Sequence, residues 1–340
     1  MMKQKESNSP PQLSIRATLA AGFDLTTKHM WLLILPVLLD CFYWLGPRLS
    51  FTTLFQSLMQ LLLSEFQQEA ALQAFSSDLF TQIPATNLFT SISLPFIGVP
   101  ALMLTTPEKT PLVTSLIEIQ SLGNWFGLLM GLLLVGLFLS TIYLTLMGRV
   151  AMLRVAAGVV TRGNVTAVLP SELTDHNFWQ LGDIAERIWY VWPRLLALGL
   201  AFFLFLLMLY IPSVIVGTIL ALLVGPLGFA TLFLVPLVGM WVVIYLCFVP
   251  HGLIRNGRSL RRAIVESGMI VHSQLSTVLT LLLTIWLINA TVDSLLLWAE
   301  DGTWFTLIAI IGHAFISTAT LMATFIFYQD RYTTLYRGNY

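Results

Sequence analysis

Four polar side chains stand inside long apolar runs of the sequence, and they are the residues best placed to do chemistry. They are Asp40, Asn289, Asp293 and His313. An ionisable group at the centre of a membrane helix costs about 2.5–3.5 kcal/mol on insertion scales, so such groups commonly mark ion, proton or solute sites. Asp40 and His313 lie about 15 Å from the start of their apolar runs, at 1.5 Å per residue. At this depth a carboxylate and an imidazole could pair.

A purely structural interpretation of the same residues stays open. Asp40 would then be neutral or bonded to a hydroxyl, Asp293 would reach the outer interface beside Trp298, and His313 would donate a hydrogen bond between helices. The chain has no Gly-Lys-Ser/Thr phosphate loop, His-Glu-x-x-His, Cys-x-x-Cys or Gly-x-Ser-x-Gly motif. Its five histidines are scattered. The sequence therefore predicts no enzyme, no cofactor and no metal site.

The composition indicates which solvent surrounds these residues. Of the 340 residues 57% are hydrophobic and 10% are charged, whereas a soluble domain is about one quarter charged. The chain is therefore expected to be an integral membrane protein, and its formal net charge of zero gives no reason to expect nucleic acid as a partner. Runs of about 20 apolar residues predict six transmembrane helices, near 30–48, 125–147, 195–221, 228–249, 275–298 and 304–328.

The longest connection, 51–124, is expected to be a helical or re-entrant insertion on the outer side of the membrane. Its first part has leucines at helical spacing and predicts an amphipathic helix. Its middle, 88–104, is apolar but contains Pro95, Gly98 and Pro100. This pattern favours an interfacial or re-entrant segment, and the alternative is a further span.

The distribution of basic residues predicts the orientation. Fifteen of the 17 Lys and Arg residues fall on one side of the six spans, and Arg48 and Lys109 fall on the other. Basic residues favour the cytoplasmic side, so both termini are expected there. Residues 1–29 would then be a cytoplasmic tail with an interfacial helix, and residues 30–340 a single six-helix membrane domain.

Two stretches with a common pattern suggest an internal repeat. "RATLAAGFDL" (16–25) and "RAIVESGMIV" (262–271) align with an offset of 246 residues, and each precedes an apolar run. Both predict amphipathic helices at the cytoplasmic interface, with Val265, Gly268, Met269 and His272 opposite Glu266 in the second. A weaker third copy is 183–196. The fold class predicted is thus all-α, with three transmembrane hairpins, each preceded by an interfacial helix. Basic residues expected to face lipid headgroups are Arg16, Lys28, Arg258, Arg261 and Arg262.

The connection "FVPHGLIRNGRSLRRAIVESGMIVHSQLSTVLTLLL" (248–283) resembles the six-span module of the glycerophosphoryl diester phosphodiesterase membrane-domain family. "LLILPVLLDCFYWLGPRLS" and "LPFIGVPALM" are similar to related uncharacterised bacterial membrane proteins. The resemblance implies a six-span fold in a bacterial plasma membrane. The family takes its name from a soluble phosphodiesterase domain that some members carry, so no catalytic residue is transferred to this chain.

Two classes of function remain. The first is a non-enzymatic membrane module, such as a scaffold, assembly factor or lipid-interacting helper, whose partners would be membrane lipids and other membrane proteins. The second is a component of a transporter for a small or lipidic solute, which needs a polar path that includes Asp40 and His313.

Overall fold

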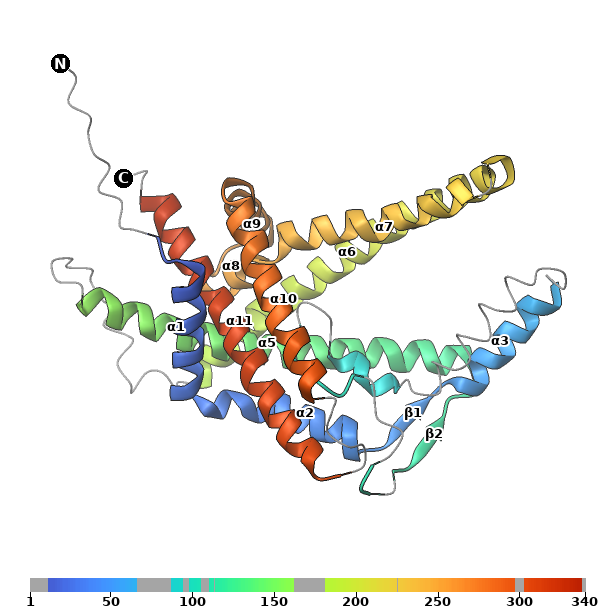
Figure 1. The fold of residues 1–340 in the computed structure, drawn as a ribbon, viewed down its shortest axis with the longest axis horizontal. Helices are drawn as coiled ribbons and strands as arrows, with labels where there is room; N and C mark the ends of the chain where they lie inside the picture. The colour runs from blue at the N-terminus through green and yellow to red at the C-terminus, as the bar shows by residue number, and fades with distance from the viewer. Residues whose placement is uncertain are drawn as a thin grey trace, which may run out of the picture. The chain divides into compact units, whose positions relative to one another are not determined.

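The computed structural model of the chain describes residues 12–65, 87–93, 98–104, 110–112, 114–161, 181–224, 226–296 and 303–337. Most of these residues are helical (Figure 1). The elements in chain order are α1 (Ile15–Lys28), η1 (Met30–Leu33), α2 (Ile34–Leu45), β1 (Arg48–Ser50), α3 (Thr52–Glu65), η3 (Leu88–Ile92), β2 (Leu116–Glu118), α5 (Leu122–Thr161), α6 (Leu181–Val224), α7 (Pro226–Leu246), α8 (Val249–Asn256), α9 (Leu260–Ser273), α10 (Leu275–Leu296) and α11 (Phe305–Arg337).

Five helical segments are long and apolar enough to cross a membrane, and a sixth is present if a bent pair counts as one span. The five are Leu122–Met152, Leu181–Leu220, Phe233–Asn256, Leu275–Leu295 and Phe305–Leu335. The bent pair joins Ile15–Lys28 to Met30–Leu45 at an angle of 90°. These are the helices of a multi-pass membrane protein, at the positions where the sequence predicts apolar spans.

The helices begin and end at different residues from those predicted. α6 has 44 residues and includes 183–196, which the sequence predicts to be a separate interfacial helix. Pro193 lies inside it without ending it, because a proline in a membrane helix removes one hydrogen bond that neighbouring groups can replace. α6 and α7 run side by side as a hairpin (Figure 1), and Pro226 begins α7 at a position where a missing N–H group costs nothing.

The chain divides into two compact units. Unit 1 contains residues 1–25, 144–283 and 322–340. Within it α9 packs against α7 and α8, and α8 packs against α6. Leu13, two residues before α1, is held by α11, because it donates its N–H to Asp330 at 3.1 Å and accepts from Arg331 at 3.0 Å. Aromatic rings fill the space between α8 and α11, where Phe248 and Phe327 stack with centroids 5.7 Å apart.

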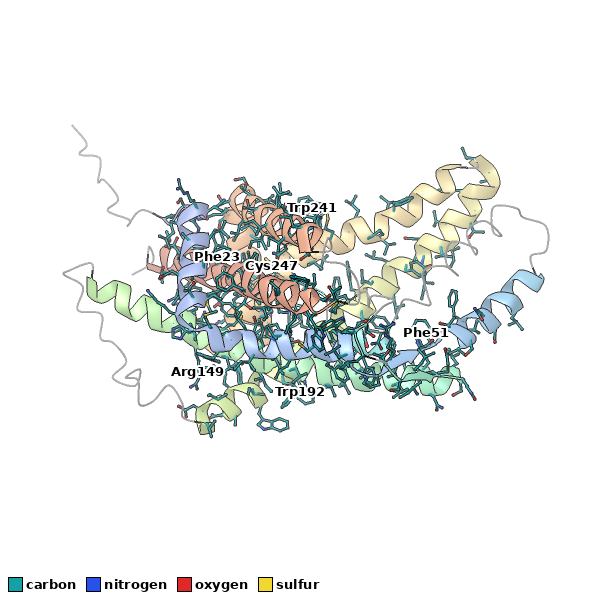
Figure 2. All side chains as sticks on the ribbon, turned by 60° about the horizontal axis from the view of Figure 1, so that its bottom comes forward. Phe23, Phe51, Arg149, Trp192, Trp241 and Cys247 are labelled. Carbon is teal, nitrogen blue, oxygen red and sulfur yellow. The ribbon has the colours of Figure 1, made fainter. Side chains whose placement is uncertain are left out.

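Unit 2 contains residues 26–143 and 284–321, which include the described part of the predicted outer insertion. A small hydrophobic core of Leu49, Leu88 and Ile119 lies there. Phe51, labelled in Figure 2, packs against Trp125 at the edge of this core, with ring centroids 6.1 Å apart. The described residues of the insertion therefore pack against β1 and the first turns of α5.

The prediction of an all-α fold is wrong in one detail. β1 and β2 form a parallel two-stranded sheet in which Leu49 pairs with Ile117. A parallel pair needs a long connection, and the chain between Ser50 and Leu116 supplies it. β1 lies directly before the predicted insertion, and β2 lies near its end. Three-residue strands are too short to show an alternating pattern, so the sequence does not reveal them.

Segment 88–104 does not cross the membrane as one helix. Its described residues form η3, which has five residues, and an irregular stretch at 98–104. This excludes the further span that the sequence left open, because a span needs about 20 helical residues.

Candidate functional site

Asp40 in α2 is fully buried and binds a stretch of irregular backbone. Its carboxylate accepts hydrogen bonds from the N–H groups of Leu102 at 3.0 Å and Met103 at 2.8 Å. Consecutive backbone N–H groups that point the same way form a natural anion site. The negative charge of Asp40 therefore holds stretch 98–104 against α2 in unit 2.

Other contacts hold the residues that come just before this stretch. The hydroxyl of Tyr43, one turn after Asp40 in α2, lies 3.0 Å from that of Ser93. Asn87 accepts from Leu49 N–H at 3.0 Å and also caps η3. The Cα of Gly136 in α5 lies so close to η3 that an added Cβ would stand 2.1 Å from the carbonyl oxygen of Ile92. Thus α2, β1 and α5 all contribute to holding 87–104.

The second pair of predicted residues joins α10 to α11. His313 Nδ1 lies 2.7 Å from Asp293 Oδ1. With Asp293 ionised, the carboxylate only accepts, so Nδ1 carries the proton and donates it. The side chain of His313 is 8% exposed and that of Asp293 is 36% exposed, so the pair runs from a buried ring to a partly accessible carboxylate. An acid–base pair of this kind can bind or pass a proton.

Asn289 extends this contact by one helical turn. It lies four residues before Asp293, on the same face of α10. Its side-chain amide donates to the Ile285 carbonyl at 2.9 Å and to the Thr320 hydroxyl at 3.3 Å. The amide therefore adds a second polar link between α10 and α11.

The structure brings the four predicted residues into unit 2 but pairs them differently. Asp40 and His313 are both buried, as expected of groups that face the interior. The predicted pair of Asp40 with His313 is not formed, because Asp40 binds backbone N–H groups and His313 binds Asp293.

Sequence reasoning missed a further polar contact in the same unit. The hydroxyls of Tyr143 in α5 and Thr318 in α11 lie 2.7 Å apart, and both side chains are buried. Hydroxyl groups are common in membrane helices, and their spacing along one helix does not identify a partner on another.

The basic residues expected to face headgroups fall into two classes. Arg16, Lys28, Arg261 and Arg262 are exposed. Arg258 instead places Nε 3.1 Å from Oε1 of Glu266, whose side chain is 3% exposed. Burial raises the pKa of Glu266 above its usual value, and the positive charges of Arg258 and Arg262 act in the opposite direction.

The predicted position of Glu266 in α9 is wrong. Glu266 is buried, together with Ala263, Ser267, Ile270 and Val271, whereas Val265, Met269 and His272 are exposed. The prediction placed Glu266 together with Arg258 and Arg262 on the face toward the lipid headgroups. Arg258 lies before α9 and compensates Glu266 from outside the helix, so the carboxylate can be buried.

Among the residues that the structure describes, no three His, Cys, Asp or Glu side chains are close enough to hold a metal ion. Taken together, the long apolar helices and the linked polar residues define a polytopic helical membrane protein. Comparisons with models of known protein families, with curated proteins and with solved structures gave no match. The resemblance to the phosphodiesterase membrane-domain family stays a prediction.

Proposed function

We propose that the chain is a non-enzymatic membrane module that interacts with lipids and serves as a scaffold or assembly helper for other membrane proteins. The main support is the use of its polar groups at membrane depth. Asp40 holds stretch 98–104, and Asp293 and Asn289 link α10 to α11. Polar groups that are hydrogen-bonded within the protein in this way stabilise its fold, whereas a transport path needs polar groups that a solute can reach.

Two surface features support interaction with lipids. α9 carries the exposed side chains Ile264, Val265 and Met269 beside the exposed Arg261 and Arg262. A helix with apolar and basic side chains of this kind binds at the boundary between acyl chains and anionic headgroups. The α6–α7 hairpin exposes large apolar side chains along most of its described length, which suits acyl chains or the helices of another membrane protein.

The proposal includes the finer topology. Both termini are cytoplasmic, the membrane is a bacterial plasma membrane, and the first and third hairpins each follow an interfacial helix. The excess of Lys and Arg on one side of the spans supports the orientation. The resemblance to the phosphodiesterase membrane-domain family supports the assignment to a bacterial plasma membrane.

A component of a transporter for a small or lipidic solute is the second candidate, and the His313–Asp293 pair favours it. Asp293 is partly exposed and His313 is buried, so the pair could take up a proton from water. In this case the polar groups of unit 2 would line a hydrated path.

Water access to Thr318 distinguishes the two functions. Thr318 is fully buried beside Tyr143. In a variant whose native cysteines are replaced by Ser, Thr318→Cys should not react with a membrane-impermeant thiol reagent in proteoliposomes. Asn124→Cys, at an exposed position near the beginning of α5, is the matched positive control. Rapid labelling of Thr318→Cys would favour the transporter.

Purification in a mild detergent tests the module directly. Lipids and membrane proteins that stay bound should be identified by mass spectrometry, with an unrelated membrane protein of similar size as the control. The proposal expects lipids enriched over that control, together with a stoichiometric protein partner. A preparation with neither would contradict it.

A further inference from the structure

A guanidinium nitrogen is buried in unit 1 without a hydrogen bond. Arg255 lies in the last turn of α8. Its Nη1 is buried and has no hydrogen-bond partner among the residues that the structure describes. The guanidinium carbon lies 5.4 Å from the centre of the Tyr332 ring. A buried cation is costly unless an anion compensates it, so this position is suited to a negatively charged ligand.

Two more arginines lie around the turn that follows Arg255. Gly257 has a φ of 56°, in the left-handed region, and a Cβ at this residue would lie 2.8 Å from Nη1 of Arg187 in α6. Arg258 donates from Nη2 to the hydroxyl of Tyr332 at 3.0 Å. Arg255 and Arg258 therefore both contact Tyr332, while Arg187 lies against Gly257 between them.

One carboxylate at this turn already has a partner. Glu266 lies 3.1 Å from Arg258 and compensates that arginine. Neither Arg187 nor Arg255 forms an ion pair within the described part of the chain. The three arginines at the turn thus carry more positive charge than Glu266 neutralises.

The position of the turn along the chain indicates which anion it meets. The apolar segment that can cross the membrane ends at Asn256, one residue after Arg255. Arginines at the end of a span lie at the level of the headgroup phosphates. A phosphate accepts several charged hydrogen bonds at once, and the planar guanidinium group suits it.

We propose that Arg187, Arg255 and the Gly257 turn bind the phosphate of an anionic phospholipid headgroup. This inference rests on the proposed function, because it assigns one specific site to a protein that interacts with lipids. Arg258 is a positioning residue, held by Glu266 and Tyr332.

The test measures lipid binding to the purified full-length chain. The delipidated protein is placed in phosphatidylcholine nanodiscs with increasing phosphatidylglycerol, and binding is followed by thermal unfolding and by native mass spectrometry of the released complex. Arg255→Gln should weaken phosphatidylglycerol binding about tenfold, because it removes a hydrogen bond between two charged groups. Arg48→Gln removes the same charge from β1 in unit 2, at a residue assigned to no lipid contact; it is the matched control and should change binding less than about twofold.

A second variant keeps the test valid if Arg255→Gln folds poorly. Arg187→Gln removes positive charge from the other side of the turn and should also weaken binding of phosphatidylglycerol, without changing that of phosphatidylcholine. Equal binding by the wild type, Arg187→Gln and Arg255→Gln would overturn the site. If these three proteins bind lipid equally, the site is refuted but the proposed lipid-interacting function is not. If the wild type binds no lipid, both proposals are contradicted.

Inorganic phosphate distinguishes the two sources of a phosphate group. Millimolar phosphate in phosphatidylcholine nanodiscs should give less stabilisation than phosphatidylglycerol. Equal or greater stabilisation by phosphate, abolished by Arg255→Gln, would show that the site takes a free anion, which refutes the assignment to a lipid.

Discussion

The close approach of Gly136 to Ile92 makes Gly136→Ala the most direct test of how the predicted outer segment is held. A Cβ at this position would stand 2.1 Å from the Ile92 carbonyl oxygen and 2.8 Å from its Cα. These atoms belong to the backbone, so no side-chain rotation relieves the overlap. α5 and η3 must instead move apart by roughly 1 Å, which forfeits a quarter to a half of the van der Waals attraction across that contact.

The size of the effect follows from two opposing terms. Overpacking typically costs about 1–3 kcal/mol, and the shift also strains the buried Tyr43–Ser93 contact, worth about 1 kcal/mol. Replacing glycine by alanine inside a helix returns about 1 kcal/mol. We therefore expect Gly136→Ala to lower the free energy of unfolding by about 1–3 kcal/mol.

Gly131→Ala is the matched control. Gly131 lies in the same helix, and a Cβ there would have nothing within 4 Å. It should gain the helix preference without the clash, so its stability should equal or exceed that of the wild type. The two native thiols, Cys41 and Cys247, are partly buried. A thiol-reactive fluorogenic dye can therefore report thermal unfolding in detergent. A midpoint for Gly136→Ala as high as that for Gly131→Ala would refute the close packing of η3 on α5.

Three further predictions concern the polar site, the buried carboxylate and the topology. Asp40→Asn puts an amide NH₂ group against a backbone N–H, so it should lower the unfolding midpoint more than Asp293→Asn, whose group is partly exposed; equal and negligible effects would contradict a structural role for Asp40. Burial raises the pKa of Glu266, so the folded state holds its proton more tightly. The stability that this carboxyl group contributes is complete below its usual pKa near 4.5 and is lost as the pH rises through the raised value. Between pH 4 and 7 the unfolding midpoint of the wild type should therefore fall relative to that of Glu266→Gln. A constant difference between the two midpoints would show that burial does not control the pKa of this group. Single cysteines at Asp78 and Asn164 should react with an impermeant reagent from outside and from inside, respectively, and the opposite result at either position would reverse the orientation.

The sequence predicts where the long helices lie because apolar runs of span length are a strong signal. It does not predict where they end. α5 has 40 residues, about 60 Å at 1.5 Å per residue, which is twice the thickness of the hydrocarbon layer. Beyond the membrane a helix continues as long as its neighbours support it, and hydropathy carries no information about those neighbours.

For the polar site, the sequence likewise predicts the residues but not their partners. Its four residues were found from their types and positions, since ionisable groups are rare in apolar runs. Their partners were not found. Counting residues from the end of a run gives the depth of each group separately, but the pairing of His313 with Asp293 depends on how α10 and α11 are shifted along each other. The partners of Asp40 are backbone N–H groups, which every residue except proline carries and which therefore leave no mark in the sequence.

The misplacement of Glu266 and the predicted alignment of the two stretches have one explanation, which is a shift of one residue. The sequence aligns the two stretches with an offset of 246, whereas the structure relates them by 245. Both helices have 14 residues, and each follows a serine whose carbonyl accepts the first helical hydrogen bond, with Thr18 bonded to Ser14 and Ala263 to Ser259. Each is followed by one residue of similar backbone conformation, His29 (φ −127°, ψ 51°) and Gln274 (φ −139°, ψ 39°).

Burial supports the offset of 245. The five buried residues of α1 correspond one by one to those of α9; they are Thr18, Ala21, Gly22, Leu25 and Thr26 in α1, and Ala263, Glu266, Ser267, Ile270 and Val271 in α9. One residue turns a helix by about 100°. An offset of 246 pairs Glu266 with the exposed Ala20 and places its carboxylate outside, whereas the offset of 245 pairs it with the buried Ala21. At this offset α1 and α9 therefore share a backbone conformation and a burial pattern, but α9 has a carboxylate where α1 has a methyl group. Because that carboxylate pairs with Arg258, the proposed arginine site lies beside α9, whereas Leu13, just before α1, stands at the position that corresponds to Arg258.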